Sequence, residues 1–457
     1  MRAFRRRSML STVVAAALVV TAIGCGGGGG DDGGEEAEQD LPGLEGPGVQ
    51  TIPGTEATEI GVSADTIRIT VISDVDNVPS PGLFQGPRDA MMAFAEHVNA
   101  QGGIAGRELE VQFLDSKLSP DEARSALIQA CEDSFAIVGT AALFLTSLEP
   151  LTGCTDQAGA ATGLPDLSVV QTTFEHACAP TSFSVNGTAI DCDTRDEVPQ
   201  TYVVSAGPAR YFDEEFDLER GSWVQGNDIQ GALDGTLPVA AGERTIVDGE
   251  DFLTSALSPQ SVYTPYVQSL RRDGVDYVAT YGNAHMQATL LQEARVQGVT
   301  ADVFTCVVSC YDEQLIEEAG DAAEGSYVTL AQLPFNETDS NENLDAMVGS
   351  VADLDGFGSM AWISGLLFQQ AVEQVVEEQG PNALTRANLL AELNTIHDFD
   401  AGGLIGPTDI AAHRGSGCLV VTQVQDGEFV RVHPEEPGTL DCDEDNLVTV
   451  ELDTTSS

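Results

Sequence analysis

The chain has 457 residues, of which 73 are acidic and 19 are basic, so its formal net charge is −54 at pH 7. A surface this acidic repels the phosphates of nucleic acids and anionic lipid headgroups, so we expect no nucleic-acid partner. The length suffices for two domains, and the hydrophobic content of 42% is ordinary for a globular protein.

The first 24 residues are predicted to be a signal peptide for export. Arginines within residues 2–7 precede the apolar run Met9–Ile23, which is too short to span a membrane comfortably. Cys25 follows Gly24 directly, and the segment therefore resembles a bacterial lipoprotein signal. That resemblance implies that Cys25 is lipidated and anchors an extracytoplasmic protein to the bacterial cell membrane. Residues 25–60 are rich in Gly, Asp, Glu and Pro, which predicts a disordered tether.

Strand and helix patterns alternate after the tether. Apolar, largely β-branched runs predict strands at Ile67–Ile72, Leu109–Leu114 and Phe135–Val138. A helical apolar spacing runs from Asp89 to Asn99. A second helix is expected to start after Ser119, because a proline at its first position and a glutamate three residues after the cap follow this serine. The β-α-β-α-β order predicts a parallel, doubly wound sheet.

The alternation restarts in the second half of the chain. The predicted elements here are strands at Tyr277–Tyr281, Val303–Cys306 and Ser326–Leu330, helices at His285–Gln297 and Met360–Glu378, and a β-hairpin over Leu419–Val432 that turns at Asp426-Gly427. Two such units without a short internal repeat predict an α/β fold with two doubly wound lobes.

Eight cysteines remain when Cys25 is set aside, and an even number in an exported chain indicates disulfides. Many connectivities are possible, but the short gaps favour the sequential pairs Cys131–Cys154, Cys178–Cys192, Cys306–Cys310 and Cys418–Cys442. Neither the cysteines nor the six histidines have the spacing of a metal site. No nucleophile or phosphate-binding motif is present in the sequence, so we expect no metal, no cofactor and no enzymatic activity.

Three segments resemble the first lobe of the type I periplasmic binding proteins, namely Gly61–Ile69, Ala93–Arg107 and Ser119–Ala123. The closest branch is the Leu/Ile/Val-binding kind that serves ABC importers, and Ala319–Gly325 is similar to the second lobe of that branch. The resemblance runs from Ile60 to Pro434. It implies two α/β lobes that are joined by three hinge crossings and close on a small solute.

The resemblance implies a lobe 1 made of residues 61–200 and 334–412, a lobe 2 made of residues 201–333 and 413–445, and a tail over residues 446–457. It also implies a monomeric receptor that delivers a small molecule to the permease subunits of an ABC importer. The same fold also serves as a ligand-sensing module for a signalling partner, and this alternative stays open.

Ligands of open parallel sheets bind beyond the carboxyl ends of the strands. This rule places the solute among the loops at residues 73–82, 140–144, 165–168, 281–283 and 307–311, and the resembled family holds its solute in the same loops. The candidate ligand-binding residues are Asp74, Asp76, Thr140, Ala141, Leu143, Phe144, Asp166, Tyr281, Asn283, Ser309 and Tyr311.

The chain departs from the amino-acid-binding members at two points. Those members use small hydroxyl residues after the third strand for the carboxylate of the ligand and a glutamate in the second lobe for its ammonium. Here only Thr140 retains a hydroxyl in the first loop, and the glutamate position falls at Val308 or Ser309. A buried ammonium would therefore lack its anion, which predicts a less charged, partly apolar solute unless Asp74, Asp76 or Asp312 supplies one.

Overall fold

The computed structural model describes residues 49, 52–78, 80–226, 245–246, 252–255 and 258–452. They belong to one compact unit that runs from Gly46 to Ser457. The predicted signal peptide, the lipidation site Cys25 and most of the predicted tether lie outside the described residues. The end of the predicted tether is part of the fold instead, because Thr58 donates its hydroxyl hydrogen to the carbonyl oxygen of Leu384, and the buried Glu59 carboxylate accepts from the backbone N–H of Arg386.

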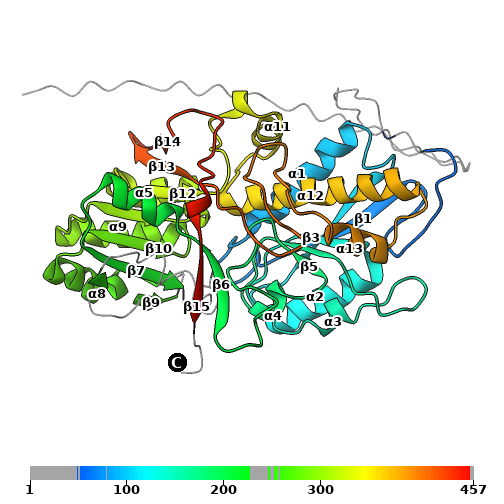
Figure 1. The fold of residues 1–457 in the computed structure, drawn as a ribbon, viewed down its shortest axis with the longest axis horizontal. Coiled ribbons are helices and arrows are strands. Elements are labelled where there is room, and N and C mark those ends of the chain that lie inside the picture. The colour runs from blue at the N-terminus through cyan, green and yellow to red at the C-terminus, as the bar shows by residue number, and fades with distance from the viewer. Residues whose placement is uncertain are drawn as a thin grey trace, which may run out of the picture. The chain divides into compact units, whose positions relative to one another are not determined.

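The first sheet has five parallel strands in the order β2-β1-β3-β4-β5. Its strands are β1 (Thr66–Ser73), β2 (Glu108–Asp115), β3 (Ala136–Thr140), β4 (Asp166–Ser168) and β5 (Ser182–Phe183). The helices that connect them are α1 (Gln85–Ala100), α2 (Pro120–Asp133), α3 (Glu149–Thr152) and α4 (Phe174–Ala177). Figure 1 shows this sheet in blue to green with α2 and α3 on one of its sides.

The second sheet has eight strands in the order β14-β13-β12-β11-β10-β7-β8, and β9 also pairs with β7. Its strands are β7 (Arg220–Gly226), β8 (Thr245–Ile246), β9 (Phe252–Thr254), β10 (Tyr277–Tyr281), β11 (Val303–Cys306), β12 (Tyr327–Leu330), β13 (Val420–Gln425) and β14 (Glu428–His433). The sheet is parallel except at the predicted hairpin, where β13 runs antiparallel to β12 and β14.

Among the residues that the structure describes, four α-helices connect or flank the strands of the second sheet (Figure 1). They are α5 (Gly207–Glu215), α8 (Gln260–Asp273), α9 (Ala284–Gln297) and α10 (Glu313–Ala319). Short 3-10 turns follow at η1 (Val308–Cys310), η2 (Gly320–Ala322), η3 (Thr338–Ser340) and η4 (Glu444–Asn446).

The chain passes between the two sheets three times. It leaves the first sheet after β5, returns after β12 to form α11 (Glu342–Ser350), α12 (Gly356–Gln379) and α13 (Arg386–Leu393), and then re-enters the second sheet at β13. A separate two-stranded sheet joins β6 (Gln200–Ser205) to β15 (Leu447–Leu452). Part of the predicted tail is therefore a strand, whereas the predicted limits of the lobes stay a prediction.

The long helix α12 is held against the first sheet by its apolar face. Trp362 is buried and meets the ring of Phe94 from α1 edge to face at 5.2 Å. Gly365 lets the two helices approach, because a Cβ at this position would lie 2.9 Å from the Phe94 ring. This packing fixes the position of the start of α12 between the two sheets.

All four sequential disulfides are formed, so the predicted pairing is confirmed. The predicted Ser119 cap is also confirmed, since its side chain accepts a hydrogen bond from the backbone N–H of Glu122. Within the described ranges, none of the helices is long and apolar enough to cross a membrane.

Candidate functional site

A hollow of about 470 Å³ lies where the carboxyl ends of strands from both sheets meet. We call it the central pocket. Its lining residues come from strand ends, from the start of α12 and from the segment before β13: Leu83, Phe84, Leu143, Val169, Val170, Gln171, Asn186, Ser205, Pro208, Gly226, Tyr281, Gly282, Asn283, Met286, Val307, Val308, Ser309, Thr329, Leu330, Ala331, Phe357, Met360, Ser416, Cys418 and Leu419.

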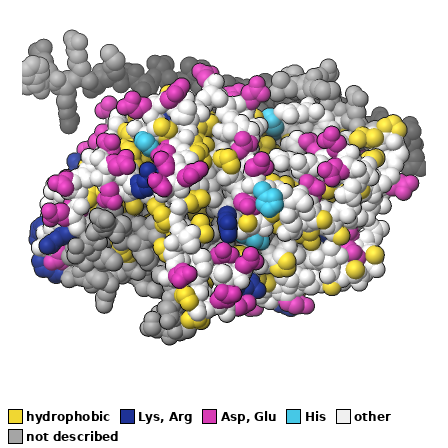
Figure 2. Space-filling model, in the orientation of Figure 1, with side chains coloured by type: hydrophobic (Ala, Val, Ile, Leu, Met, Phe, Trp, Pro, Cys, Tyr) yellow, Lys and Arg dark blue, Asp and Glu magenta, His cyan; other side chains and the backbone are white. Residues whose placement is uncertain are grey.

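The lining of the central pocket is uncharged in the part of the chain that the structure describes. Aliphatic, aromatic and thioether side chains predominate, and the polar ones are amides and hydroxyls. Acidic side chains are instead spread over the molecular surface, as Figure 2 shows for one face. The pocket therefore differs in character from the rest of a chain that carries 73 carboxylates.

The second sheet contributes the loops after β10 and β11. Asn283 follows β10 and caps α9, since its side-chain oxygen accepts from the backbone N–H of Met286 at 3.0 Å. Ser309 lies in η1 after β11 and donates its hydroxyl hydrogen to the carbonyl oxygen of Gly282. The disulfide between Cys306 and Cys310 closes this turn. These hydrogen bonds and the disulfide thus fix the conformations of the two loops.

The first sheet contributes the loops after β3 and β4. Leu143 is held in the wall of the pocket because its backbone N–H donates to Asp74 Oδ2 at 2.8 Å. The backbone N–H groups of Val169 and Val170 both donate to the carbonyl oxygen of Thr140. These bonds place an apolar surface at the carboxyl end of β3 and β4.

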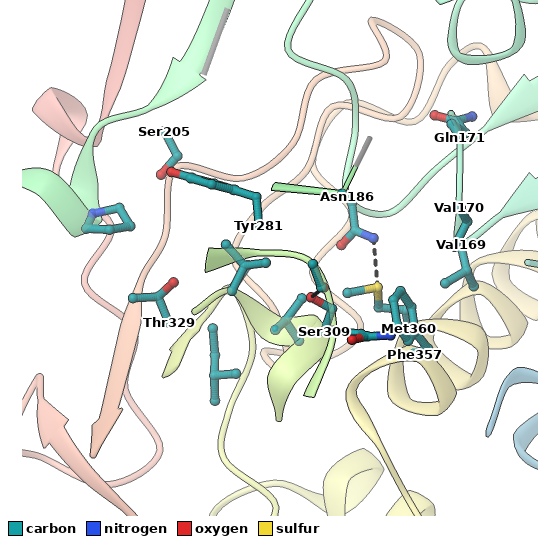
Figure 3. Close-up of a pocket in the computed structure, with 18 of the residues that line it drawn as sticks. Val169, Val170, Gln171, Asn186, Ser205, Tyr281, Ser309, Thr329, Phe357 and Met360 are labelled. Atoms are coloured by element: carbon teal, nitrogen blue, oxygen red, sulfur yellow. Dashed lines mark hydrogen bonds between the residues drawn. The ribbon is translucent and has the colours of Figure 1, made fainter. Parts of the chain in front are cut away.

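The start of α12 closes the pocket between the two sheets. Phe357 and Met360 from its first turns line the pocket, as the close-up in Figure 3 shows. Gly356 donates its backbone N–H to the carbonyl oxygen of Tyr311 at 2.9 Å. A Cβ at Gly356 would collide with the carbonyl group of Val308, so glycine permits this close approach of α12 to η1.

Four of the predicted ligand-binding residues line the central pocket, namely Leu143, Tyr281, Asn283 and Ser309. Val308, the other residue at the position of the family's glutamate, also lines it. Phe144 is half-buried and lies outside the lining, although it neighbours Leu143 in sequence. The expected contact of its ring with the solute therefore has no support in the geometry.

The three predicted anion sources lie outside the lining as well. The buried Asp74 carboxylate accepts from Ser116 and from two backbone N–H groups. Asp76 is exposed. Asp312 caps α10, and burial raises the pKa of its carboxyl. It lines a separate hollow, together with Tyr311, whose buried hydroxyl accepts from the backbone N–H of Phe335.

Thr140, Ala141 and Asp166 are buried behind the pocket wall. Thr140 donates its hydroxyl hydrogen to Asp166 Oδ1 at 2.7 Å, and His176 Nε2 lies 2.8 Å from Asp166 Oδ2. Ala141 donates its backbone N–H to the carbonyl oxygen of Ile72. The one hydroxyl that the sequence offered for a carboxylate is therefore already used inside the protein.

Sequence reasoning missed several lining residues, above all Gln171, Asn186, Met360 and Thr329. Gln171 and Asn186 each follow a short strand, β4 or β5, by three positions, so the strand-end rule would have found them only if these strands had been predicted. Met360 depends on how α12 packs, which has no local sequence signal. In the described ranges, no group of three or more His, Cys, Asp or Glu side chains is placed to hold a metal ion.

Residues 245–428 match the model of a protein family described as periplasmic binding protein. A fatty acid ABC transporter substrate-binding protein from Thermomonospora curvata is similar in structure, with a TM-score of 0.63 and 18% identity over 83% of this chain and 93% of that chain. This chain has the type I periplasmic binding protein fold. The resemblance and the fold class predicted from the sequence are therefore confirmed.

Two further structures of this fold are similar to the chain. A leucine-binding protein from Thermotoga maritima has a TM-score of 0.59 and 15% identity over 80% of this chain and 98% of its own. The second is a branched-chain amino acid transporter substrate-binding protein from Streptococcus pneumoniae in complex with isoleucine. It has a TM-score of 0.60 and 16% identity, and the match covers 80% of this chain and 100% of that chain. Among curated proteins, no sequence matches this chain.

Proposed function

We propose that this protein is an extracytoplasmic receptor of the periplasmic binding protein kind. Its two lobes close around an apolar, uncharged solute, which the protein delivers to an ABC permease. It acts by binding and not by catalysis. The fold and the match of residues 245–428 to the periplasmic binding protein family support the receptor role.

The uncharged lining of the central pocket is the observation that carries the choice of solute. An amino acid carries an ammonium and a carboxylate, and moving either from water into a pocket without an opposite charge is costly. Apolar side chains gain free energy when they cover an apolar solute. A pocket volume of about 470 Å³ lies within the range of small-molecule sites. One structural neighbour, from Thermomonospora curvata, is described as a fatty acid transporter component, which supports an apolar solute.

Native mass spectrometry of the freshly purified protein tests this proposal. We expect a small apolar molecule to co-purify and to be released on denaturation. Val170→Arg puts a charge into the pocket wall and should abolish the bound mass. Val296→Arg is the matched control, because Val296 is 73% exposed on α9 and lies outside the pocket. Equal loading of both variants would refute the site.

We further propose that Cys25 carries the lipid anchor and that the segment between Cys25 and residue 52 is its tether, since Thr58 and Glu59 are already bonded to the folded part of the chain. The apolar run that ends at Gly24-Cys25 supports this. Cells fed a fatty-acid analogue should label the wild-type protein and leave Cys25→Ser unlabelled. Equal labelling of the two proteins would show that the chain is anchored elsewhere or carries no lipid at Cys25.

A further inference from the structure

Several polar side chains of the central pocket can offer only hydrogen-bond acceptors to a solute, because they already donate their hydrogen atoms to other groups of the protein. Gln171, Asn186 and Ser309 each donate to a protein acceptor and keep lone pairs for the pocket. The chemistry of their partners fixes the direction of each hydrogen bond. The pattern then restricts the headgroup of the solute.

Gln171 is oriented by a chain of hydrogen bonds that ends at the buried Asp166 carboxylate. A carboxylate accepts hydrogen bonds, so Ser182 gives its single hydroxyl hydrogen to Asp166 Oδ2 at 3.0 Å. The Ser182 oxygen must then accept from Gln171 Nε2, which lies 3.0 Å away. Figure 3 shows the amide oxygen of Gln171 turned to the side on which Asn186 lies. Gln171 thus presents a carbonyl oxygen.

Asn186 and Ser309 are oriented in the same sense. Asn186 Nδ2 lies 2.9 Å from the Sδ atom of Met360, and a thioether sulfur has no hydrogen to donate. The amide nitrogen of Asn186 therefore faces the sulfur, and its oxygen is left on the opposite side (Figure 3). Ser309 gives its hydroxyl hydrogen to the carbonyl oxygen of Gly282. All three side chains offer acceptors to a solute.

Donors are present in the pocket too, but they are neutral. Asn283 keeps its amide hydrogens because its oxygen is occupied by the backbone N–H of Met286. The hydroxyl of Ser416 accepts from the backbone N–H of Cys418 and keeps its own hydrogen. A solute headgroup that both donates and accepts would satisfy both sets of groups.

We infer that the solute is an apolar alcohol, an uncharged molecule whose hydroxyl donates to Gln171 or Asn186. This inference rests on the proposed function and specifies its substrate class. A carboxylate only accepts, so the two amide oxygens offer it nothing, and only the neutral donors of Asn283 and Ser416 could replace its hydrogen bonds to water. An ammonium would find acceptors but no anion among the described lining residues.

Titration calorimetry with three molecules of equal chain length tests the headgroup. The full chain is titrated with octanol, octanoate and octylammonium at neutral pH. We expect octanol to bind at least about tenfold more tightly than either charged molecule, since each charged headgroup is desolvated without a partner of opposite charge. Octanoate or octylammonium binding as tightly as octanol would overturn the inference and leave an apolar-solute receptor. Absence of binding by all three would count against the proposed function as well.

Gln171→Met keeps the length of the side chain and removes its oxygen. We expect it to weaken octanol binding about fivefold to tenfold and to narrow the gap between octanol and octanoate. Gln157→Met is the matched control, because Gln157 is exposed and lies outside the pocket. An unchanged octanol affinity in Gln171→Met, with thermal unfolding like that of the wild type, would contradict the assigned role of Gln171.

Discussion

Asp355 precedes the first turns of α12, which line the pocket, and its titration makes the stability of the protein depend on pH. It caps α12, and its Oδ1 atom accepts from the backbone N–H of Gly358 at 2.5 Å. Burial, with added repulsion from Asp312 and Asp89, raises the pKa of Asp355 to about 7. The carboxyl of Asp355 therefore keeps its proton to a higher pH in the folded protein than an ordinary aspartate does.

We predict that Asp355→Asn changes the pH dependence of stability. The folded pKa of Asp355 lies above its value in the unfolded chain, so the folded protein binds more protons between about pH 4 and pH 7. The free energy of unfolding of the wild type should therefore fall as pH rises through this window. Asparagine still caps the helix and does not titrate, so the variant should lack this fall.

The difference should reach on the order of 2 kcal/mol at neutral pH, once the partial exposure of the side chain is allowed for. Denaturant unfolding of both proteins across the window provides the measurement. If the two stability curves ran parallel from pH 4 to pH 7, the raised pKa of Asp355 would be disproved.

Among the secondary-structure elements, the packing of α1 against α12 positions the wall of the pocket that α12 forms. Gly365 of α12 faces the Phe94 ring of α1, and Met360 lies in the same helix one turn and a half towards the pocket. A larger side chain at Gly365 would push the two helices apart. The geometry of the pocket wall therefore depends on a glycine that does not touch the pocket.

We predict that Gly365→Leu destabilises the protein by about 1–3 kcal/mol, because the added atoms overlap the Phe94 ring. Gly349→Ala in α11 is the matched control. A Cβ at Gly349 meets nothing within 4 Å, so this change should be neutral or stabilise by about 0.5 kcal/mol through helix propensity. Denaturant unfolding measures both. Equal effects of the two changes would show that the helix crossing has room at Gly365.

Local signals in the sequence were sufficient for most elements that line the pocket. The β-branched run at Val303–Cys306 is strand β11 with the predicted bounds. α12 begins at Gly356, four residues before the predicted Met360, because its Asp355 cap precedes two glycines that carry no apolar periodicity. The strands β4 and β5 have three and two residues, too few for a periodic pattern, and they were not predicted.

The candidate site was predictable only where it follows a strand end. Tyr281, Asn283 and Ser309 could be named because Tyr281 ends β10, and the other two lie within three residues of the ends of β10 and β11. Asp74 also follows a strand end, that of β1, yet its carboxylate is bonded inside the protein. The prediction of a loop at residues 165–168 was wrong for Asp166, which is the first residue of β4 and whose carboxylate is also bonded internally. The direction of a side chain at a strand end depends on its partners from distant segments, which sequence spacing does not reveal.

In the whole molecule, the acidic side chains and the central pocket occupy different places. Acidic side chains are spread over the face that Figure 2 shows, whereas the described lining of the central pocket carries no charge. Acidic groups on the surface keep the protein soluble and cost little where water solvates them. The proposed selectivity for an uncharged solute thus depends on the absence of charge from the described pocket lining and not on the sign of the surface.

Titration calorimetry with leucine, isoleucine and valine tests whether the central pocket rejects charged solutes. These solutes are bound by proteins of the same fold, and each carries an ammonium and a carboxylate. The uncharged pocket predicts no measurable binding of any of them at millimolar concentration, because neither charge finds a partner among the described lining residues. Micromolar binding of leucine would contradict the account and would require a charged group to enter the pocket on closure.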